Sequence, residues 1–238
     1  NFTLPLPRNF SFWSTVYSDG WCALPPFNID KEQKRLNVVV PARHNSMYPV
    51  SLYEEKKRLV VLVENSRQLT TAARSEVTKT ISTMLRIDES LEEFYVQARK
   101  HPCYRWVSRR GAGRLLRSPT VFEDVVKMIC TTNCSWALTE IMVAALTTKL
   151  GVHIQGDVYS FPTPNAIAAQ SESFLRKEIR CGYRAPYLLE LSQRITNGEL
   201  SIEQWRTSDA PTEELFNEVR SVKGVGEYAA GNILKLLG

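Results

Sequence analysis

The pattern of apolar and polar positions divides the chain into two parts. Up to about residue 68, short β-branched runs such as "LNVVV" at 36–40 and "RLVVLVE" at 58–64 alternate with proline-rich stretches, which predicts an antiparallel sheet. From there on, apolar residues recur every three or four positions and predict helices. We therefore expect an α+β protein, with a sheet domain that includes a helix over residues 1–88 and a mostly α-helical domain over residues 89–238.

Capping residues indicate where several helices begin and end. Ser90 followed by Glu93 predicts a capping box. Ser118–Pro119 and Thr163–Pro164 are typical helix starts, because proline is tolerated in the first turn. Gly151 follows an apolar helical run and predicts a C-terminal cap.

Two predicted amphipathic helices near the end of the chain, "DAPTEELFNEVRS" and "EYAAGNILKLLG", are joined only by "VKGVG". Such a tight reversal needs residues that tolerate positive φ, which predicts a turn role for Gly224 and Gly226. Glycine also leaves the backbone N–H groups at the start of the second helix open to an anion. An ordinary helix–helix turn, however, explains an isolated Gly-x-Gly without any ligand.

Charge is distributed unevenly along the chain. The formal net charge of +5 permits an anionic partner without requiring one. Between Tyr104 and Ser118 there is no acidic residue, and the stretch predicts phosphate contacts, with a solvated helix face as the alternative. Its five arginines are Arg105, Arg109, Arg110, Arg114 and Arg117.

Composition argues against several classes of protein. No apolar run approaches the roughly 18 residues of a membrane span, and the N-terminus lacks the order of a signal peptide, so we expect an intracellular protein without a membrane partner. The five cysteines include no Cys-x-x-Cys pair and suggest neither a disulfide framework nor a zinc site. Because the chain starts with Asn1 and stops at Gly238 in or after a helical run, we expect trimmed ends.

The stretch "VKGVGEYAAGNIL" resembles the helix-hairpin-helix of DNA glycosylases, here at about residues 212–237. Residues 111–151 and 161–195 are similar, in order and spacing, to the helical core of the 8-oxoguanine and 3-methyladenine DNA glycosylases. The resemblance implies a member of the helix-hairpin-helix (HhH-GPD) superfamily that acts in base excision repair. Its partner would be double-stranded DNA containing a damaged base, bound by a monomer in the bacterial cytoplasm or the nucleus.

The same resemblance implies roles for individual residues. Asn133 falls where these enzymes place an asparagine that fills the space left by the flipped nucleotide. Tyr183 matches an aromatic wedge, and Arg184 matches an arginine that contacts the unpaired partner base. Without the resemblance, Asn133 reads as a helix C-cap and Tyr183 as a half-buried core aromatic.

At the hairpin, the resemblance implies DNA contacts from Lys223, Gly224, Val225 and Gly226. It also implies that backbone carbonyls ligate a structural K⁺ or Na⁺ that stiffens the turn. These are the carbonyls of Arg220, Val222 and Val225. No other cofactor is implied.

Tyr228 marks a departure from the bifunctional members of the family, which carry a lysine at this position. A phenol cannot form a Schiff base with the sugar, and Lys223 lies on the other side of the turn, so we expect a monofunctional enzyme that hydrolyses the N-glycosidic bond. The family's catalytic aspartate follows this position by about 20 residues, so we expect it beyond Gly238.

No catalytic residue is therefore identified within the chain. Acidic residues on predicted helices read as exposed helix faces; these are Glu123, Asp124, Glu140 and Glu190. The main alternative is a non-catalytic helix-hairpin-helix protein that recognises lesions or DNA structure. A third interpretation, an unrelated helical protein with a chance Gly-x-Gly turn, predicts no affinity for DNA.

Overall fold

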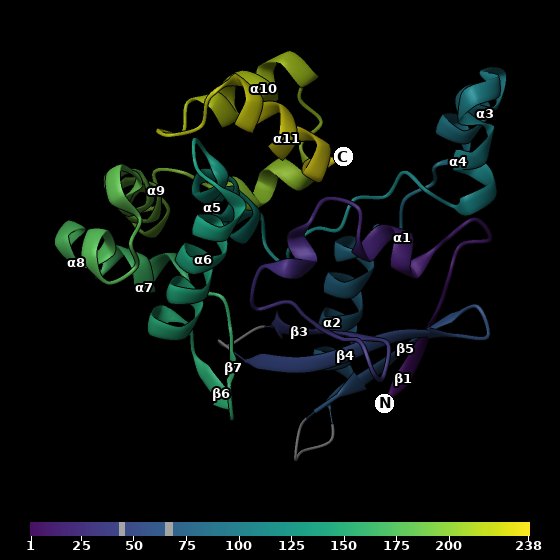
Figure 1. The fold of residues 1–238 in the computed structure, drawn as a ribbon, viewed down its shortest axis with the longest axis horizontal. Coiled ribbons are helices and arrows are strands. Elements are labelled where there is room, and N and C mark those ends of the chain that lie inside the picture. The colour runs from purple at the N-terminus through teal and green to yellow at the C-terminus, as the bar shows by residue number, and fades with distance from the viewer. Residues whose placement is uncertain (43–45, 65–68) are drawn as a thin grey trace. The chain divides into compact units, whose positions relative to one another are not determined.

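The computed structural model describes residues 1–42, 46–64 and 69–238. Contacts between residues divide the chain into two compact units, Asn1–Pro119 and Thr120–Gly238. The first contains an antiparallel sheet and the second is mostly helical (Figure 1), so the predicted α+β class is confirmed. Among the described residues, no helix combines the length and the apolar character needed to cross a membrane.

The sheet of the first unit has five strands in the order β1-β5-β4-β3-β2. The two apolar runs that predicted strands are β3 and β5. The first strand, β1, pairs with β5 at the edge, and Phe2 lies opposite Val61. The bounds are β1 Phe2–Pro5, β2 Asn28–Asp30, β3 Arg35–Pro41, β4 Met47–Glu55 and β5 Arg58–Val63.

Helix α2, Thr71–Met84, packs against this sheet (Figure 1). The hydroxyl of Thr70 caps it by accepting a hydrogen bond from the N–H of Ala73 at 3.2 Å. Its buried stripe follows the predicted period of three to four residues. The unit also contains α1 Phe12–Val16, η1 Trp21–Ala23, α3 Glu92–Lys100, η2 Pro102–Tyr104 and α4 Arg105–Arg110.

The capping box predicted for α3 is wrong. The residue at the N-cap is Leu91, whose side chain has no acceptor, and the helix begins at Glu92. Ser90 lies one residue too early, and its hydroxyl accepts a hydrogen bond from the N–H of Glu92 at 3.4 Å. The serine therefore belongs to the turn before the helix.

Two of the five arginines expected at phosphates are instead buried in the first unit. Arg114 donates hydrogen bonds from Nε to the carbonyl of Arg86 (2.9 Å) and from Nη2 to the carbonyl of Glu89 (3.0 Å). Arg117 pairs with the Glu89 carboxylate at 2.5 Å. The prediction of phosphate contacts is therefore wrong for Arg114 and Arg117. Their bonds also hold the segment after α4 to the sheet unit, so the contact boundary lies after Pro119 and not after residue 88.

Helix α5, Val121–Thr131, is the central helix of the second unit and is buried from Val121 to Cys130. It contacts α6, α11 and η4 (Figure 1). The other elements are α6 Trp136–Leu150, β6 His153–Gln155, β7 Val158–Tyr159, α7 Pro164–Ala168, α8 Glu172–Lys177, η3 Gly182–Arg184, α9 Ala185–Thr196, η4 Ile202–Thr207, α10 Thr212–Arg220 and α11 Glu227–Leu237.

The start of α5 is secured by two polar side chains. Thr120 accepts a hydrogen bond from the N–H of Glu123 at 3.1 Å. The carboxylate of Glu203, on η4, accepts hydrogen bonds from the N–H groups of Val121 (3.0 Å) and Phe122 (2.9 Å). Three of the free N–H groups of the first turn are thus satisfied, and a negative charge lies at the positive end of the helix.

Candidate nucleic-acid interface

The last two helices form the predicted helix–turn–helix. Leu215 and Val219 of α10 and Ala229 and Ile233 of α11 are buried, as their spacing predicted. The turn itself is anchored by two buried valines, and the N–H of Val225 donates to the carbonyl of Val222 at 3.0 Å. The reversal is therefore held from inside by apolar contacts, while its glycines lie at its surface.

The two glycines of the turn differ in what they require. Gly224 has φ of +90°, and a Cβ at this position would lie 2.6 Å from a ring carbon of Tyr187. Gly226 has φ of −84° and ψ of −177°, and a Cβ there would meet nothing within 4 Å. The predicted positive φ is confirmed for Gly224 and is wrong for Gly226, which adopts an extended conformation as the N-cap of α11.

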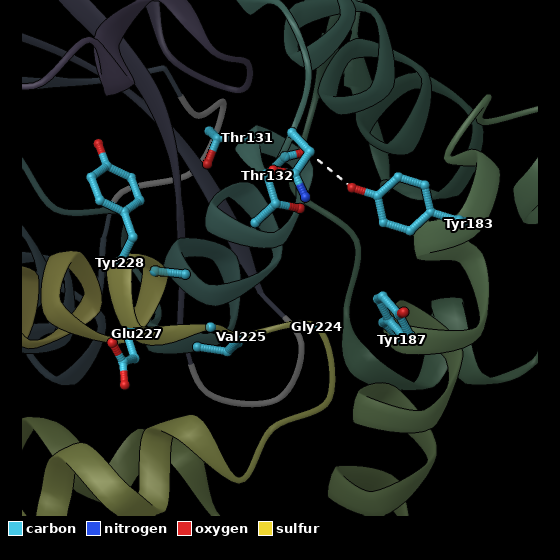
Figure 2. A pocket seen from close by; sticks show the side chains of 11 residues that line it. Thr131, Thr132, Tyr183, Tyr187, Gly224, Val225, Glu227 and Tyr228 are labelled. Atoms are coloured by element: carbon cyan, nitrogen blue, oxygen red, sulfur yellow. Dashed lines mark hydrogen bonds between the residues drawn. The ribbon is translucent and has the colours of Figure 1, made fainter.

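A cavity of about 800 Å³ lies at this turn. Its lining comes from the loop after α5, from the α9 region and from the start of α11. Figure 2 shows Tyr183 and Tyr187 on one side of the view and Tyr228 on the other, with Thr131 and Thr132 between them. The lining residues are Thr131–Asn133, Tyr183, Tyr187 and 224–229.

Asn133 lies in the loop between α5 and α6. The C-cap of α5 is Thr132, so the alternative of Asn133 as the helix cap is not what the structure contains. The residue has φ of +46°, a left-handed conformation that asparagine adopts more readily than most residues. Its side chain is exposed and lines the cavity. Its role as the residue that fills an emptied base stack stays a prediction.

Tyr183 is 44% exposed, so it is half-buried, as the alternative interpretation expected, but it lies at the cavity and not in the core. Its hydroxyl donates to the carbonyl of Thr132 at 3.2 Å, as drawn in Figure 2. Its ring meets that of Tyr187 edge to face, with the centroids 6.2 Å apart. These contacts hold the ring at the cavity, and the predicted wedge role remains to be tested.

Arg184 follows Tyr183 in the chain and is only 3% exposed. Its guanidinium donates to the same Thr132 carbonyl and lies 4.5 Å from the ring centroid of Tyr183. In this structure, Arg184 therefore stabilises the loop after α5 by its hydrogen bond to the Thr132 carbonyl. Its contact with an unpaired base stays a prediction. Such a contact would require the guanidinium to leave its buried position.

Lys223 and Tyr228 lie on either side of Gly224–Gly226 in the chain. Lys223 is exposed and pairs with Glu190 of α9 at 3.0 Å, and this hydrogen bond raises the pKa of Lys223. Tyr228 is 82% exposed at the edge of the cavity. The position that the resemblance equates with the lysine of bifunctional glycosylases thus carries an accessible phenol.

The four carboxylates considered from sequence do not line the cavity. Each is engaged elsewhere: Glu123 with Lys127 at 2.6 Å, Asp124 with Arg206 at 3.2 Å, Glu140 with the indole of Trp136 at 2.9 Å and Glu190 with Lys223. Glu123 and Asp124 are moreover buried, so their interpretation as exposed helix faces is wrong.

Glu227 and Tyr187 are among the cavity-lining residues that the sequence analysis missed. Glu227 is the first residue of α11, and its exposed carboxylate lies 3.5 Å from the guanidinium of Arg220. Tyr187 supports Gly224 from α9. The spacing of Tyr183 and Tyr187, four residues apart, could have indicated a shared face, and Glu227 directly follows the second glycine.

The turn offers backbone oxygens of the kind that a monovalent cation prefers. The carbonyl of Val222 accepts a hydrogen bond, whereas those of Arg220 and Val225 accept none from the described residues. Carbonyl oxygens without a donor in a tight turn fit the implied K⁺ or Na⁺, because each has lone pairs available. In the described ranges, no cluster of three or more His, Cys, Asp or Glu side chains forms a metal site.

Comparison with known proteins supports the resemblance. No family model matches the chain. A DNA-3-methyladenine glycosylase of Bacillus subtilis is 21% identical over 201 residues, which are 83% of this chain but only 66% of that protein. The chain thus spans about two thirds of the length of this relative.

Two solved structures share the fold. The 3-methyladenine DNA-glycosylase of Archaeoglobus fulgidus has a TM-score of 0.78 and 20% identity, over 98% of this chain and 78% of its own. An 8-oxoguanine glycosylase/lyase of Clostridium acetobutylicum, in complex with double-stranded DNA containing cytosine opposite 8-oxoguanine, has a TM-score of 0.72 and 20% identity, over 95% and 72%. The resemblance to helix-hairpin-helix DNA glycosylases is confirmed at the level of the fold.

Proposed function

We propose that the protein is a DNA glycosylase of base excision repair that removes a damaged base from double-stranded DNA. The observation that carries the proposal is the composition of one cavity. It brings the glycines of the hairpin together with the exposed Asn133 loop and with Tyr183. The likeness to two glycosylase structures, one of them bound to DNA, supports it.

In this proposal, the hairpin binds a DNA phosphate. The N–H groups of the first turn of α11 carry the positive end of the helix dipole. Gly226 has open space where a Cβ would be, so a phosphate can approach these groups closely. Lys223 lies on the α10 side of the turn, where its ammonium pairs with Glu190 at 3.0 Å and would contact the phosphate by exchanging this partner. Backbone donors read no sequence, which suits an enzyme that must search any DNA.

Asn133 and Tyr183 then compensate for the removal of a nucleotide from the duplex. Flipping a base costs a few kcal/mol of stacking and pairing. An exposed amide and an exposed aromatic ring at one cavity can replace part of the lost stacking and hydrogen bonding. Tyr183 and Arg184 both donate hydrogen bonds to the Thr132 carbonyl. These bonds hold the turn at 182–184 against the loop that carries Asn133.

The proposed chemistry is hydrolysis without strand cleavage. Tyr228 has no amine, so water must be the nucleophile at the sugar carbon. The four paired carboxylates on α5, α6 and α9 take no part. A K⁺ or Na⁺ held by the carbonyls of Arg220, Val222 and Val225 would supply positive charge and rigidity at the hairpin. The protein would act as a monomer wherever cellular DNA is found.

A base-release assay tests this function. The full-length protein is incubated with duplexes that carry a panel of alkylated, oxidised, deaminated or mispaired bases. Release of a free base, with strand breaks only after alkali and no borohydride-trapped adduct, is the expected result. Tyr228→Lys serves as a matched variant, because it restores an amine and should make trapping detectable if the sugar reaches this position.

Two other results would change the conclusion. Tight binding of lesion-containing DNA without base release from any duplex would support the non-catalytic alternative. Strand cleavage at the rate of base release, or an adduct trapped by borohydride in the unaltered protein, would show that another amine acts and that Tyr228 does not mark a monofunctional enzyme.

A further inference from the structure

The short helix α4 and the turn before it carry an exposed surface that the proposed glycosylase site does not use. No acidic residue occurs from 94 to 122. Tyr104 is 54% and Trp106 49% exposed. We define the α4 surface as Tyr104, Arg105, Trp106, Arg109 and Arg110, all of which are exposed.

The helix itself fixes these side chains on one outward side. Val107 points inward and forms a small apolar core with Tyr95 and Ala98 of α3. On a helix, residues four apart share a face, which places Arg105 with Arg109 and Trp106 with Arg110. The indole ring of Trp106 and the guanidinium groups are therefore neighbours on one helix.

The charge of this surface is not neutralised within the described part of the chain. The side chains of Arg109 and Arg110 have no hydrogen-bond or ion-pair partner among the described residues, and Arg105 donates only to the carbonyl of Arg99 at 3.4 Å. Glu92 is paired with Arg99 at 2.7 Å, on α3. Uncompensated guanidinium groups beside exposed aromatic rings fit a partner that has both negative charge and flat apolar faces.

We propose that the α4 surface binds single-stranded nucleic acid. The arginines contact successive phosphates, and Trp106 stacks on an unpaired base, with Tyr104 as a second platform. A duplex offers the phosphates but hides the base faces, so the aromatic rings favour an unpaired strand. An acidic protein would use the arginines without requiring the stacking geometry. The inference rests on α4 alone and is independent of the proposed glycosylase activity.

Fluorescence anisotropy with a short labelled oligothymidylate tests the proposal. Trp106→Ala should weaken binding by about 5- to 160-fold, the range of one lost base–aromatic stack. Replacing Arg105, Arg109 and Arg110 by glutamine should also weaken binding and should reduce the slope of log K against log salt by about 2, because each phosphate contact contributes about 0.7 on single strands. Circular dichroism confirms that these surface variants are folded.

A matched control carries the same loss of charge elsewhere. Lys31, Lys79 and Lys177 are exposed, and their triple replacement by glutamine should leave the salt slope nearly unchanged. Asn133→Ala separates the two sites, since it should weaken binding to abasic duplex without affecting oligothymidylate. Equal affinity of wild type and Trp106→Ala, or equal effects of the two triple variants, would overturn the proposal. So would arginine-dependent binding of a polyglutamate peptide that exceeds binding of the oligonucleotide.

Discussion

Alanine substitutions at the two glycines of the hairpin should have different effects: Gly224→Ala should lower stability, and Gly226→Ala should weaken DNA binding. Gly224→Ala is expected to unfold the second unit more easily, for two reasons visible in the structure. An L-residue at φ of +90° is strained by about 1–2 kcal/mol. The new Cβ would also lie 2.6 Å from the ring of Tyr187, and overpacking of this kind costs about 1–3 kcal/mol. The sum is about 2–5 kcal/mol, which corresponds to a melting temperature lower by about 4–20 °C.

Gly226→Ala has neither cost, because φ is −84° and the Cβ enters open space. Stability should change by less than about 1 kcal/mol, the difference between glycine and alanine at an N-cap. Binding to abasic duplex should nevertheless fall, because the methyl group occupies the space in which a phosphate would approach the N–H groups of α11.

Urea denaturation and anisotropy with an abasic duplex, both on the full-length protein, measure these two effects. Tyr187→Ala supplies a double-mutant control: in that background, Gly224→Ala should lose most of its steric cost, because the ring is gone and only the Cβ of residue 187 remains, at 3.2 Å, while the cost of positive φ is retained. A Gly226→Ala protein with unchanged DNA affinity would refute the phosphate-binding role of the hairpin. Equal destabilisation by both alanines would refute the structural distinction between the glycines.

Three further results are expected. Asn133→Ala and Tyr183→Ala should each weaken binding to abasic duplex in anisotropy while shifting the melting temperature little, since both side chains are exposed and Tyr183 loses one hydrogen bond of about 1 kcal/mol. Lys127→Met should lower the free energy of unfolding in urea by about 3–5 kcal/mol, because it removes the ammonium that lies 2.6 Å from the buried Glu123 carboxylate, and the added Glu123→Leu change should restore most of it. Ellman's reagent at pH 8 should modify the exposed Cys103 rapidly and Cys130 only on unfolding, because a hydrogen bond with Cys181 and burial raise the pKa of the Cys130 thiol well above its ordinary value.

Local patterns predicted the elements well where one segment carries its own signal. The β-branched runs became β3 and β5, Thr163–Pro164 opened α7, and the helix–turn–helix buried its expected faces. Each of these depends on residues within a few positions of one another. The pairing of β1 with β5 joins residues that are far apart in the chain, and no local pattern could reveal it.

The errors arose where the partner of a polar group decides its role. Arg114 and Arg117 have the same side chain as Arg109 and Arg110, yet the first pair is buried on carbonyls and a carboxylate, whereas the second pair has no partner among the described residues. A run of arginines in a sequence indicates positive charge, but it does not indicate which of the side chains are exposed and which are buried. Likewise, Gly226 looked equivalent to Gly224, although only Gly224 needs its backbone freedom. Glu227 was missed because its place at the cavity depends on how α11 meets the loop after α5.

The carbonyl of Thr132 links the parts of the site that lie far apart in sequence. It accepts hydrogen bonds from both Tyr183 and Arg184, and it directly precedes Asn133. The loop that carries the asparagine and the turn that carries the tyrosine therefore keep one relative position before any DNA is bound. A preorganised pair loses less conformational entropy on binding than two independent loops would. Because Arg184 is buried behind this junction, its guanidinium would serve Asn133 and Tyr183 together by holding their backbones in place.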